Sequence, residues 1–94
     1  MLKFEWDNNK AESNLIKHCV SFKEAETVFE DSEALLIPDP DHSFGEERFI
    51  LLGRSKKHNI LVVVHCERSD VIRIISARKA TKKESRQYLG GCYA

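Results

Sequence analysis

Three strand-like segments joined by very short turns constrain the fold of this chain most. Residues 48–55 (RFILLGRS), 60–68 (ILVVVHCER) and 71–79 (VIRIISARK) are rich in Val, Ile and Leu, and only a few polar residues separate each from the next. Parallel pairing needs a crossover connection of roughly a dozen residues or more, so connections this short predict antiparallel hairpins. The three segments therefore predict an antiparallel meander.

Two further strands are expected outside these hairpins. Residues 34–38 (ALLIP) form an apolar run that stops at Pro38, because proline has no N–H to donate to a neighbouring strand. This segment should extend the meander to four strands over residues 34–79. Residues 2–6 (LKFEW) alternate apolar and charged side chains, which is typical of a half-buried strand, and should add one more strand to the sheet.

Capping residues predict where helices begin. Asp7 suits the N-cap of a short amphipathic helix, and Ser21 with Glu24 forms a capping box before a second helix. Thr81 and Glu84 repeat the capping box near the end of the chain. The predicted helices span residues 7–18, 21–30 and 81–89.

The order of these elements, β-α-α-β-β-β-β-α, predicts the fold class. Helices come early and strands late, which is typical of an α+β domain with its helices packed on one face of a twisted antiparallel sheet. At 94 residues the chain is long enough for one such domain, which we expect to span residues 1–94.

The charge is distributed very unevenly along the chain. Residues 1–47 contain four basic and twelve acidic residues, a net charge of −8, whereas residues 48–94 contain eleven basic and three acidic residues, a net charge of +8. The two halves can neutralise each other within one fold, or the basic half can bind a polyanion. Because several of the basic residues lie on predicted strands, the pattern favours a polyanion partner.

Several protein classes are not indicated by the sequence. No apolar run approaches the roughly 20 residues that span a bilayer, and the first residues lack the apolar core of a signal peptide. The three cysteines show no CxxC or metal-ligand spacing, so we expect free thiols in a reducing cytoplasm. No nucleotide-binding loop is present, and neither a metal nor another cofactor is expected.

His65 and Glu67 are the candidate proton-transfer groups. An imidazole titrates near neutrality, and the spacing of two residues places both side chains on one side of a strand. The alternative is structural: His65 is then a half-buried histidine with a satisfied hydrogen bond, and Glu67 a charge at the end of a hairpin.

The strand arginines suit a phosphate ligand, because a planar guanidinium matches phosphate oxygens with two parallel hydrogen bonds. Arg78 follows an apolar run that should fix its backbone, so it is the candidate for holding and neutralising a reacting phosphate. The alternative for any single arginine is a surface ion pair. The further candidates for phosphate binding are Arg54, Arg68, Arg73 and Lys79.

Four blocks of the sequence resemble the BrnT family, in the right order and over nearly the whole chain. They are FEWDNNKAESNLIKHCVSFKEAETVF, IPDPDHSFGEERFILLGRS, LVVVHCER and IRIISARKATKKESRQY. The resemblance implies a RelE-like fold and the activity of a bacterial type II toxin that cleaves RNA by metal-independent attack of a ribose 2′-OH. It also implies a BrnA-like antitoxin partner, through which the complex binds operator DNA.

Within this resemblance the candidate residues acquire expected roles. His65, Glu67 and Arg78 would be catalytic, and Arg54, Arg68, Arg73 and Lys79 would bind RNA. One residue departs from the family pattern, because Cys19 stands where a glycine is expected and a positive φ there would cost strain. A non-catalytic nucleic-acid-binding or adaptor domain, or a toxin that has lost cleavage, remains the alternative.

Overall fold

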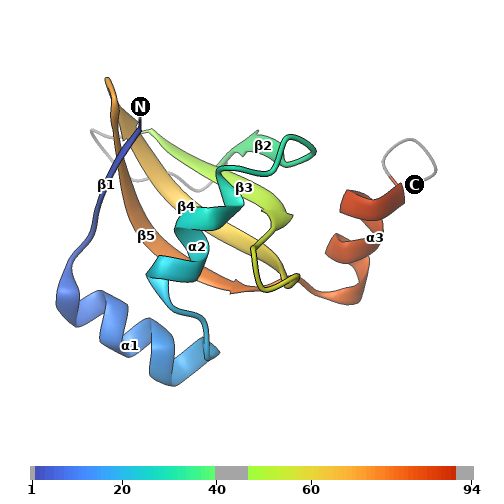
Figure 1. The fold of residues 1–94 in the computed structure, drawn as a ribbon, viewed down its shortest axis with the longest axis horizontal. Coiled ribbons are helices and arrows are strands. Elements are labelled where there is room, and N and C mark those ends of the chain that lie inside the picture. The colour runs from blue at the N-terminus through green and yellow to red at the C-terminus, as the bar shows by residue number, and fades with distance from the viewer. Residues whose placement is uncertain (1, 40–46, 91–94) are drawn as a thin grey trace.

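The computed structural model describes residues 2–39 and 47–90 and has the predicted order of elements (Figure 1). Five strands form one sheet in the order β1-β5-β4-β3-β2. The elements are β1 (Lys3–Glu5), α1 (Asn8–His18), α2 (Phe22–Val28), β2 (Leu35–Pro38), β3 (Arg48–Arg54), β4 (Ile60–Arg68), β5 (Val71–Lys79) and α3 (Lys82–Gly90). The α+β class is therefore confirmed.

The predicted meander is confirmed, since β2, β3, β4 and β5 pair antiparallel in succession. The prediction of an entirely antiparallel sheet is wrong, because β1 pairs parallel to β5, with Phe4 beside Ile72. No turn fixes the direction of β1, which is separated from β5 by most of the chain. Its aromatic residues set it instead: Phe4 packs edge-on against Phe29, and Trp6, just after the strand, packs in the same way on Phe22.

The core lies between one face of the sheet and α2, which lies in front of the sheet in Figure 1, and α1 lies below the sheet in this view. Leu51, Val63 and Ala77 are aligned across β3, β4 and β5 on this face and pack against Phe22 and Val28. We call this the helix face and the opposite side the distal face. Leu52, Val62 and Arg78 lie on the distal face by the alternation of the strands.

The third helix differs from the prediction that the helices pack on one face. No residue of α3 is buried, and Figure 1 shows it beyond the end of the sheet, apart from α1 and α2. The predicted capping box at its start is confirmed: the N–H of Thr81 donates to Glu84 at 2.9 Å, and the N–H of Glu84 donates to the Thr81 hydroxyl at 3.1 Å. The side chains of Thr81 and Glu84 therefore determine where α3 begins.

The first two helices begin as predicted, but Glu24 has a different partner. Asp7 accepts from the N–H of Asn9 at 2.8 Å, and the Ser21 hydroxyl accepts from the N–H of Glu24 at 3.0 Å. The Glu24 carboxylate is buried and accepts from the Ser55 hydroxyl at 2.6 Å and from the Asn59 amide at 2.9 Å. Glu24 thus connects α2 to the turn between β3 and β4.

Close packing holds α2 against β3 at Gly53. A Cβ atom there would lie 2.8 Å from Cβ of Ala34 and 2.9 Å from Cγ1 of Val28. Only glycine fits at this distance. The end of β3 and the segment after α2 are therefore held together.

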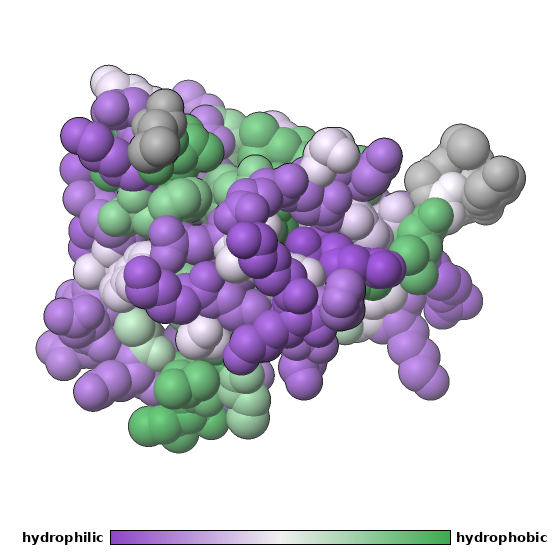
Figure 2. All heavy atoms as spheres, in the orientation of Figure 1, coloured by the Kyte–Doolittle hydropathy of each residue, from purple (hydrophilic) through white to green (hydrophobic). Residues whose placement is uncertain are grey.

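The surface on the helix side is mostly hydrophilic, as Figure 2 shows. A hydrophobic patch lies over α1 at the lower edge of this view. In this part of α1, Leu15 and Ile16 are 50% and 83% exposed. No helix of the described residues is long and apolar enough to cross a membrane.

Candidate functional site

The predicted site residues are divided between the two faces of the sheet. Arg54 is aligned with Ile60, and Arg78 is aligned with Val62, so both arginines lie on the distal face. They are separated by β4 and by a shift of two residues, which corresponds to roughly 12 Å between their Cα atoms. The structure therefore places these two arginines on the same face and near the same end of the sheet.

His65 lies on the other face and is 0% exposed. Its ring stacks on Phe49 at a centroid distance of 5.9 Å and meets Phe29 edge-on at 4.9 Å. Its Nε2 lies 2.9 Å from Oε2 of Glu67, whose side chain is 38% exposed. His65 and Glu67 are brought together as predicted, but the structure does not bring either of them together with Arg78.

The remaining predicted residues do not gather around Arg78 either. Arg73 is aligned with Cys66, and Arg68 with Val71, so both lie toward the other end of the distal face. Arg73 forms an ion pair with Glu5 at 3.2 Å. Lys79 is aligned with Leu61 and lies exposed on the helix side of β5.

Arg78 has a strong partner in α3. Its guanidinium donates two hydrogen bonds to the carboxylate of Glu84, at 2.8 and 2.9 Å. This pairing lowers the pKa of Glu84 to about 2 and raises the pKa of Arg78. Arg78 therefore joins the end of β5 to the first turn of α3, and a phosphate at Arg78 would compete with Glu84.

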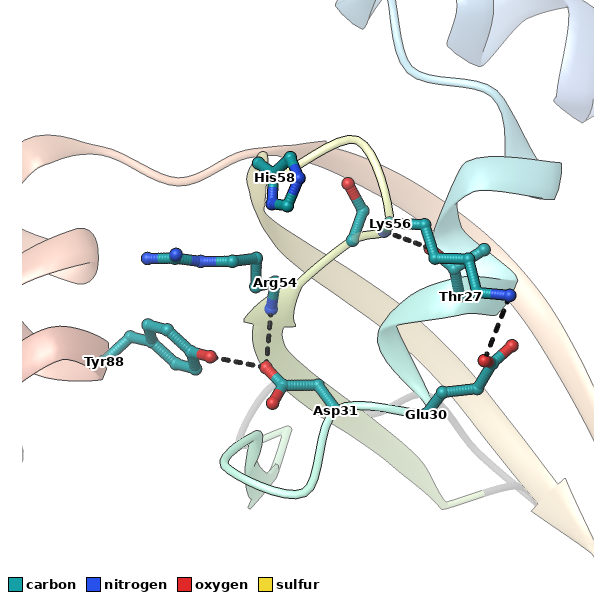
Figure 3. Close-up of a pocket in the computed structure, with 8 residues that line it drawn as sticks. Thr27, Glu30, Asp31, Arg54, Lys56, His58 and Tyr88 are labelled. Carbon is teal, nitrogen blue, oxygen red and sulfur yellow. Dashed lines mark hydrogen bonds and ion pairs between the residues drawn. The ribbon is translucent and has the colours of Figure 1, made fainter.

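A pocket of about 390 Å³ lies where the β3–β4 turn meets α2 and α3 (Figure 3). Arg54, at the end of β3, extends toward Tyr88 of α3, and its guanidinium carbon lies 5.9 Å from the centre of the tyrosine ring. The residues that line the pocket are Thr27, Glu30, Asp31, Arg54, Ser55, Lys56, His58 and Tyr88. Three segments of the chain thus form the pocket, and two of them, residues 54–58 and α3, supply its cationic, imidazole and phenol groups.

Asp31 organises one wall of this pocket. It accepts from the Tyr88 hydroxyl at 2.5 Å and from the N–H of Arg54 at 2.8 Å. Burial alone would raise the pKa of Asp31, but the hydrogen bonds from Tyr88, Arg54 and Glu33 outweigh burial and lower it. Burial and the bond to Asp31 raise the pKa of Tyr88 to about 12, so its phenol stays protonated at neutral pH. Tyr88 is therefore suited to hold Arg54 in place.

The β3–β4 turn forms the opposite wall. Lys56 forms an ion pair with Glu30 at 3.4 Å, and its N–H donates to the Thr27 hydroxyl at 2.9 Å. His58 is exposed, has a φ of 68° and lines the same pocket. A non-glycine residue in this conformation is uncommon and tends to occur in turns and functional sites.

No sequence pattern assigns a role to Lys56 or His58. Histidines in loops have no periodicity that shows where they point. One signal was available: the basic run RSKKH begins with a candidate phosphate ligand, Arg54, and occupies a single tight turn. Within residues 2–39 and 47–90, no three His, Cys, Asp or Glu side chains are arranged to hold a metal ion.

Comparison with known proteins identifies the class to which this chain belongs. It is the class of ribonuclease toxins of type II toxin–antitoxin systems. The chain belongs to the BrnT family within it, since the family model described as "Ribonuclease toxin, BrnT, of type II toxin-antitoxin system" matches residues 6–84. Membership of such a family implies an antitoxin partner.

A solved structure supports the fold. The ribonuclease toxin BrnT of Brucella abortus has a TM-score of 0.68 and 22% sequence identity to this chain. The match covers 87% of this chain and 100% of the Brucella protein. Comparison with curated proteins gives no match.

Proposed function

We propose that this chain cleaves RNA at the pocket between the β3–β4 turn and α3, by attack of a ribose 2′-OH on the adjacent phosphate. The observation that supports this proposal most is the gathering of Arg54, Lys56, His58 and Tyr88 around one pocket. Such a reaction needs cations to stabilise the charge that develops on the phosphorus oxygens and groups that move protons. In the RelE-like mechanism that the family resemblance implies, no metal takes part.

Each group has a role in this proposal. Arg54, fixed by the ring of Tyr88, holds the scissile phosphate, and Lys56 adds a second positive charge. His58 moves a proton to or from the ribose or the leaving oxygen, because its imidazole is exposed beside both cations. Arg78, predicted to hold the scissile phosphate, reaches the substrate from the same face if phosphate displaces Glu84.

His65 and Glu67 keep their predicted role in proton transfer as a second set of candidates. Their geometry supports this role less than the geometry of His58 does. His65 has no exposed surface, and its Nδ1 has no hydrogen-bond partner in the part of the chain that the structure describes. Glu67 is accessible, but it lies on the helix face, away from Arg54 and Arg78.

The experiment is cleavage of a single-stranded RNA by the purified chain, in the presence of EDTA. Attack by the 2′-OH leaves a 2′,3′-cyclic phosphate on one product and a 5′-OH on the other. We expect these ends, and we expect EDTA to have no effect. Products with a 3′-OH, or cleavage that stops with EDTA, would contradict the mechanism, and binding without cleavage would support the non-catalytic alternative.

The partner in this proposal is a BrnA-like antitoxin that covers part of the basic surface and blocks RNA. Arginine-rich surfaces attract acidic partners, and electrostatic steering makes such association fast at low salt. Binding of operator DNA would occur through the antitoxin. Addition of the antitoxin to saturation should stop RNA cleavage, and undiminished cleavage in the saturated complex would exclude this form of neutralisation.

A further inference from the structure

A second pocket, of about 180 Å³, lies at the outer edge of β5 and is lined by α1. Strand β1 covers this edge only at residues 71–73. The later part of β5 pairs with β4 on its other side but has no neighbouring strand at this edge. Asn14 of α1 takes the place of a strand there: its amide donates to the carbonyl of Ala77 at 2.8 Å and accepts from the N–H of Ala77 at 3.1 Å. The backbone N–H and C=O of Ala77 at this edge therefore both have hydrogen-bond partners.

Most of the side chains around this base are basic or hydroxylic, and the others are Asn14 and Ile75. Lys10, Lys17 and His18 of α1 line the pocket together with the hydroxyls of Ser13 and Ser76, and no acidic residue does. Neither lysine forms an ion pair among the described residues, whereas Lys23 and Lys56 do. Lys10 and Lys17 are two helical turns apart, which corresponds to roughly 10 Å along α1. The pocket therefore presents unneutralised positive charge on both sides of two hydroxyl groups.

The helix dipole of α1 does not favour an anion here, because Lys17 and His18 are in its last turn. The C-terminal end of a helix is equivalent to about half a negative charge. Two lysines outweigh this partial charge severalfold. Binding of an anion would therefore depend on the side chains of Lys10 and Lys17, which makes their removal a sharp test.

The position of Ser76 connects this pocket to the candidate active site. Ser76 is aligned with Val64 on the distal face, two residues before Arg78 on the same strand. Alternate residues of a strand are about 6.7 Å apart, so Ser76 is the next side chain along this face from Arg78. Ser76 thus lies on the same face as Arg54 and Arg78, and at the edge of β5 it lines a pocket with the lysines of α1.

We propose that the pocket formed by Lys10, Ser13, Lys17 and Ser76 binds a backbone phosphate of single-stranded RNA, at a position remote from the bond that is cleaved. The inference rests on the proposed function, because it extends the path of the same substrate. The contacts are to phosphate and not to bases, so they strengthen binding without selecting a sequence.

The test measures binding of a non-cleavable probe, a 2′-O-methyl single-stranded RNA of about 12 nucleotides. Its affinity is measured as a function of salt for the parent chain and for Lys10→Gln/Lys17→Gln. Each lost phosphate contact on a single strand should reduce the slope of log affinity against log salt by about 0.7, and the pocket binds one phosphate, so the double variant should lose about 0.7. The control Lys3→Gln/Lys23→Gln changes the charge equally and should keep the parent slope. Lys10→Arg/Lys17→Arg should keep it too.

Two results would overturn the inference. One is an equal slope for the two double glutamine variants. The other is weaker antitoxin binding by Lys10→Gln/Lys17→Gln with unchanged RNA binding, which would make the pocket a protein contact. Failure of the proposed function is a different result, since a parent chain that binds the probe but cleaves no RNA would refute cleavage alone.

Discussion

Cys19 ends α1 in a left-handed conformation, with φ 58° and ψ 28°, although it has a side chain. The family resemblance predicts a glycine at this position, and the observed backbone gives the physical reason. A left-handed conformation costs a non-glycine residue roughly 1–2 kcal/mol, and the greater freedom of glycine in the unfolded chain removes about 0.4–1 kcal/mol of the gain.

Cys19→Gly should therefore raise the free energy of unfolding by about 0.5–1 kcal/mol, as measured by urea denaturation. Cys19→Ala serves as the control, because it removes the thiol and keeps the strain. If the alanine variant is at least as stable as the glycine variant, strain at this position is not the cause.

Substitution of His58 should affect mainly activity, whereas substitution of His65 should affect stability. His58→Gln should lower the rate of RNA cleavage by about 10²–10⁴ with little change in stability, because the side chain is exposed beside Arg54 and Lys56. His65→Gln should lower the free energy of unfolding by about 1–3 kcal/mol, because the ring is packed between Phe29 and Phe49.

Cleavage rates and thermal unfolding of both variants would test this assignment, with Glu67→Gln for comparison. A large loss of cleavage in folded His65→Gln or Glu67→Gln, with His58→Gln unaffected, would restore the predicted proton-transfer pair.

The burial of His65 could have been predicted in part from the sequence. Alternation along β4 places His65 with Leu61 and Val63, and those two residues are the most deeply buried on the helix face. The sequence does not show which face the helices cover, so the charged end of the strand suggested accessibility. The position of His58 could not be predicted, because it depends on the left-handed turn and on the hydrogen bond that the Asn59 amide donates to Glu24.

At the scale of elements, the contact between β5 and α3 rests on one ion pair. Arg78 and Glu84 make two hydrogen bonds, and α3 has no buried residue. The same helix supplies Tyr88 to the pocket at Arg54. Arg78 can therefore act in two ways, on the phosphate directly or through the position of α3.

Substitutions of Arg78 and of Glu84 distinguish a direct role of Arg78 on the phosphate from a role in positioning α3. Arg78→Ala should lower cleavage by about 10²–10³ and abolish growth arrest, as expected for loss of a charge-stabilising donor, and Arg78→Lys should restore little. Glu84→Gln should keep cleavage within about tenfold of the parent, because Arg78 remains available to phosphate. Equal losses in Arg78→Ala and Glu84→Gln, at matched expression, would show that Arg78 acts by holding α3.

Sequence predicted the elements more completely than their arrangement. Apolar runs and short turns specify the hairpins of β3, β4 and β5, and side-chain caps specify the starts of the helices. The direction of β1 depends on contacts of Phe4 and Trp6 with residues of α2 and its C-terminal end. The place of α3 depends on Arg78, Asp31 and their partners, and no local pattern contains that information.

Across the whole molecule, the opposite charges of the two halves of the sequence partly neutralise each other. Glu5 pairs with Arg73, and Glu30 pairs with Lys56, each across the two halves. Arg78 instead pairs with Glu84 within the basic half. Neutralisation between the halves therefore accounts for Lys56 and Arg73. Lys10 and Lys17 belong to the acidic half, so they do not bear on a polyanion at the basic half.

The shifted pKa values predict how the stability of the whole fold depends on pH. The pKa of Glu84 falls to about 2 from 4.5, so its contribution is complete above pH 4.5 and is lost as the pH falls toward 2. The pKa of Tyr88 rises to about 12 from 10, so its contribution is present below pH 10 and is lost as the pH rises toward 12. Solvent screening limits the acid contribution to about 1 kcal/mol or less.

Thermal unfolding as a function of pH would test this prediction against two matched variants. The difference between the parent chain and Glu84→Gln should shrink between pH 4.5 and 2. The difference between the parent chain and Tyr88→Phe should shrink between pH 10 and 12. Differences that stay constant through these ranges would show that neither group is coupled to folding.

The parallel pairing of β1 with β5 has a consequence for the order in which the chain folds. Glu5 and Arg73 lie opposite each other in the sheet but are 68 residues apart in sequence. The hairpins of β3, β4 and β5 close loops of only a few residues, whereas the β1 pairing closes almost the longest loop that the domain contains. We therefore expect the hairpins to form early and β1 to add last. A nascent chain would keep its N-terminal strand unpaired until β5 had been synthesised.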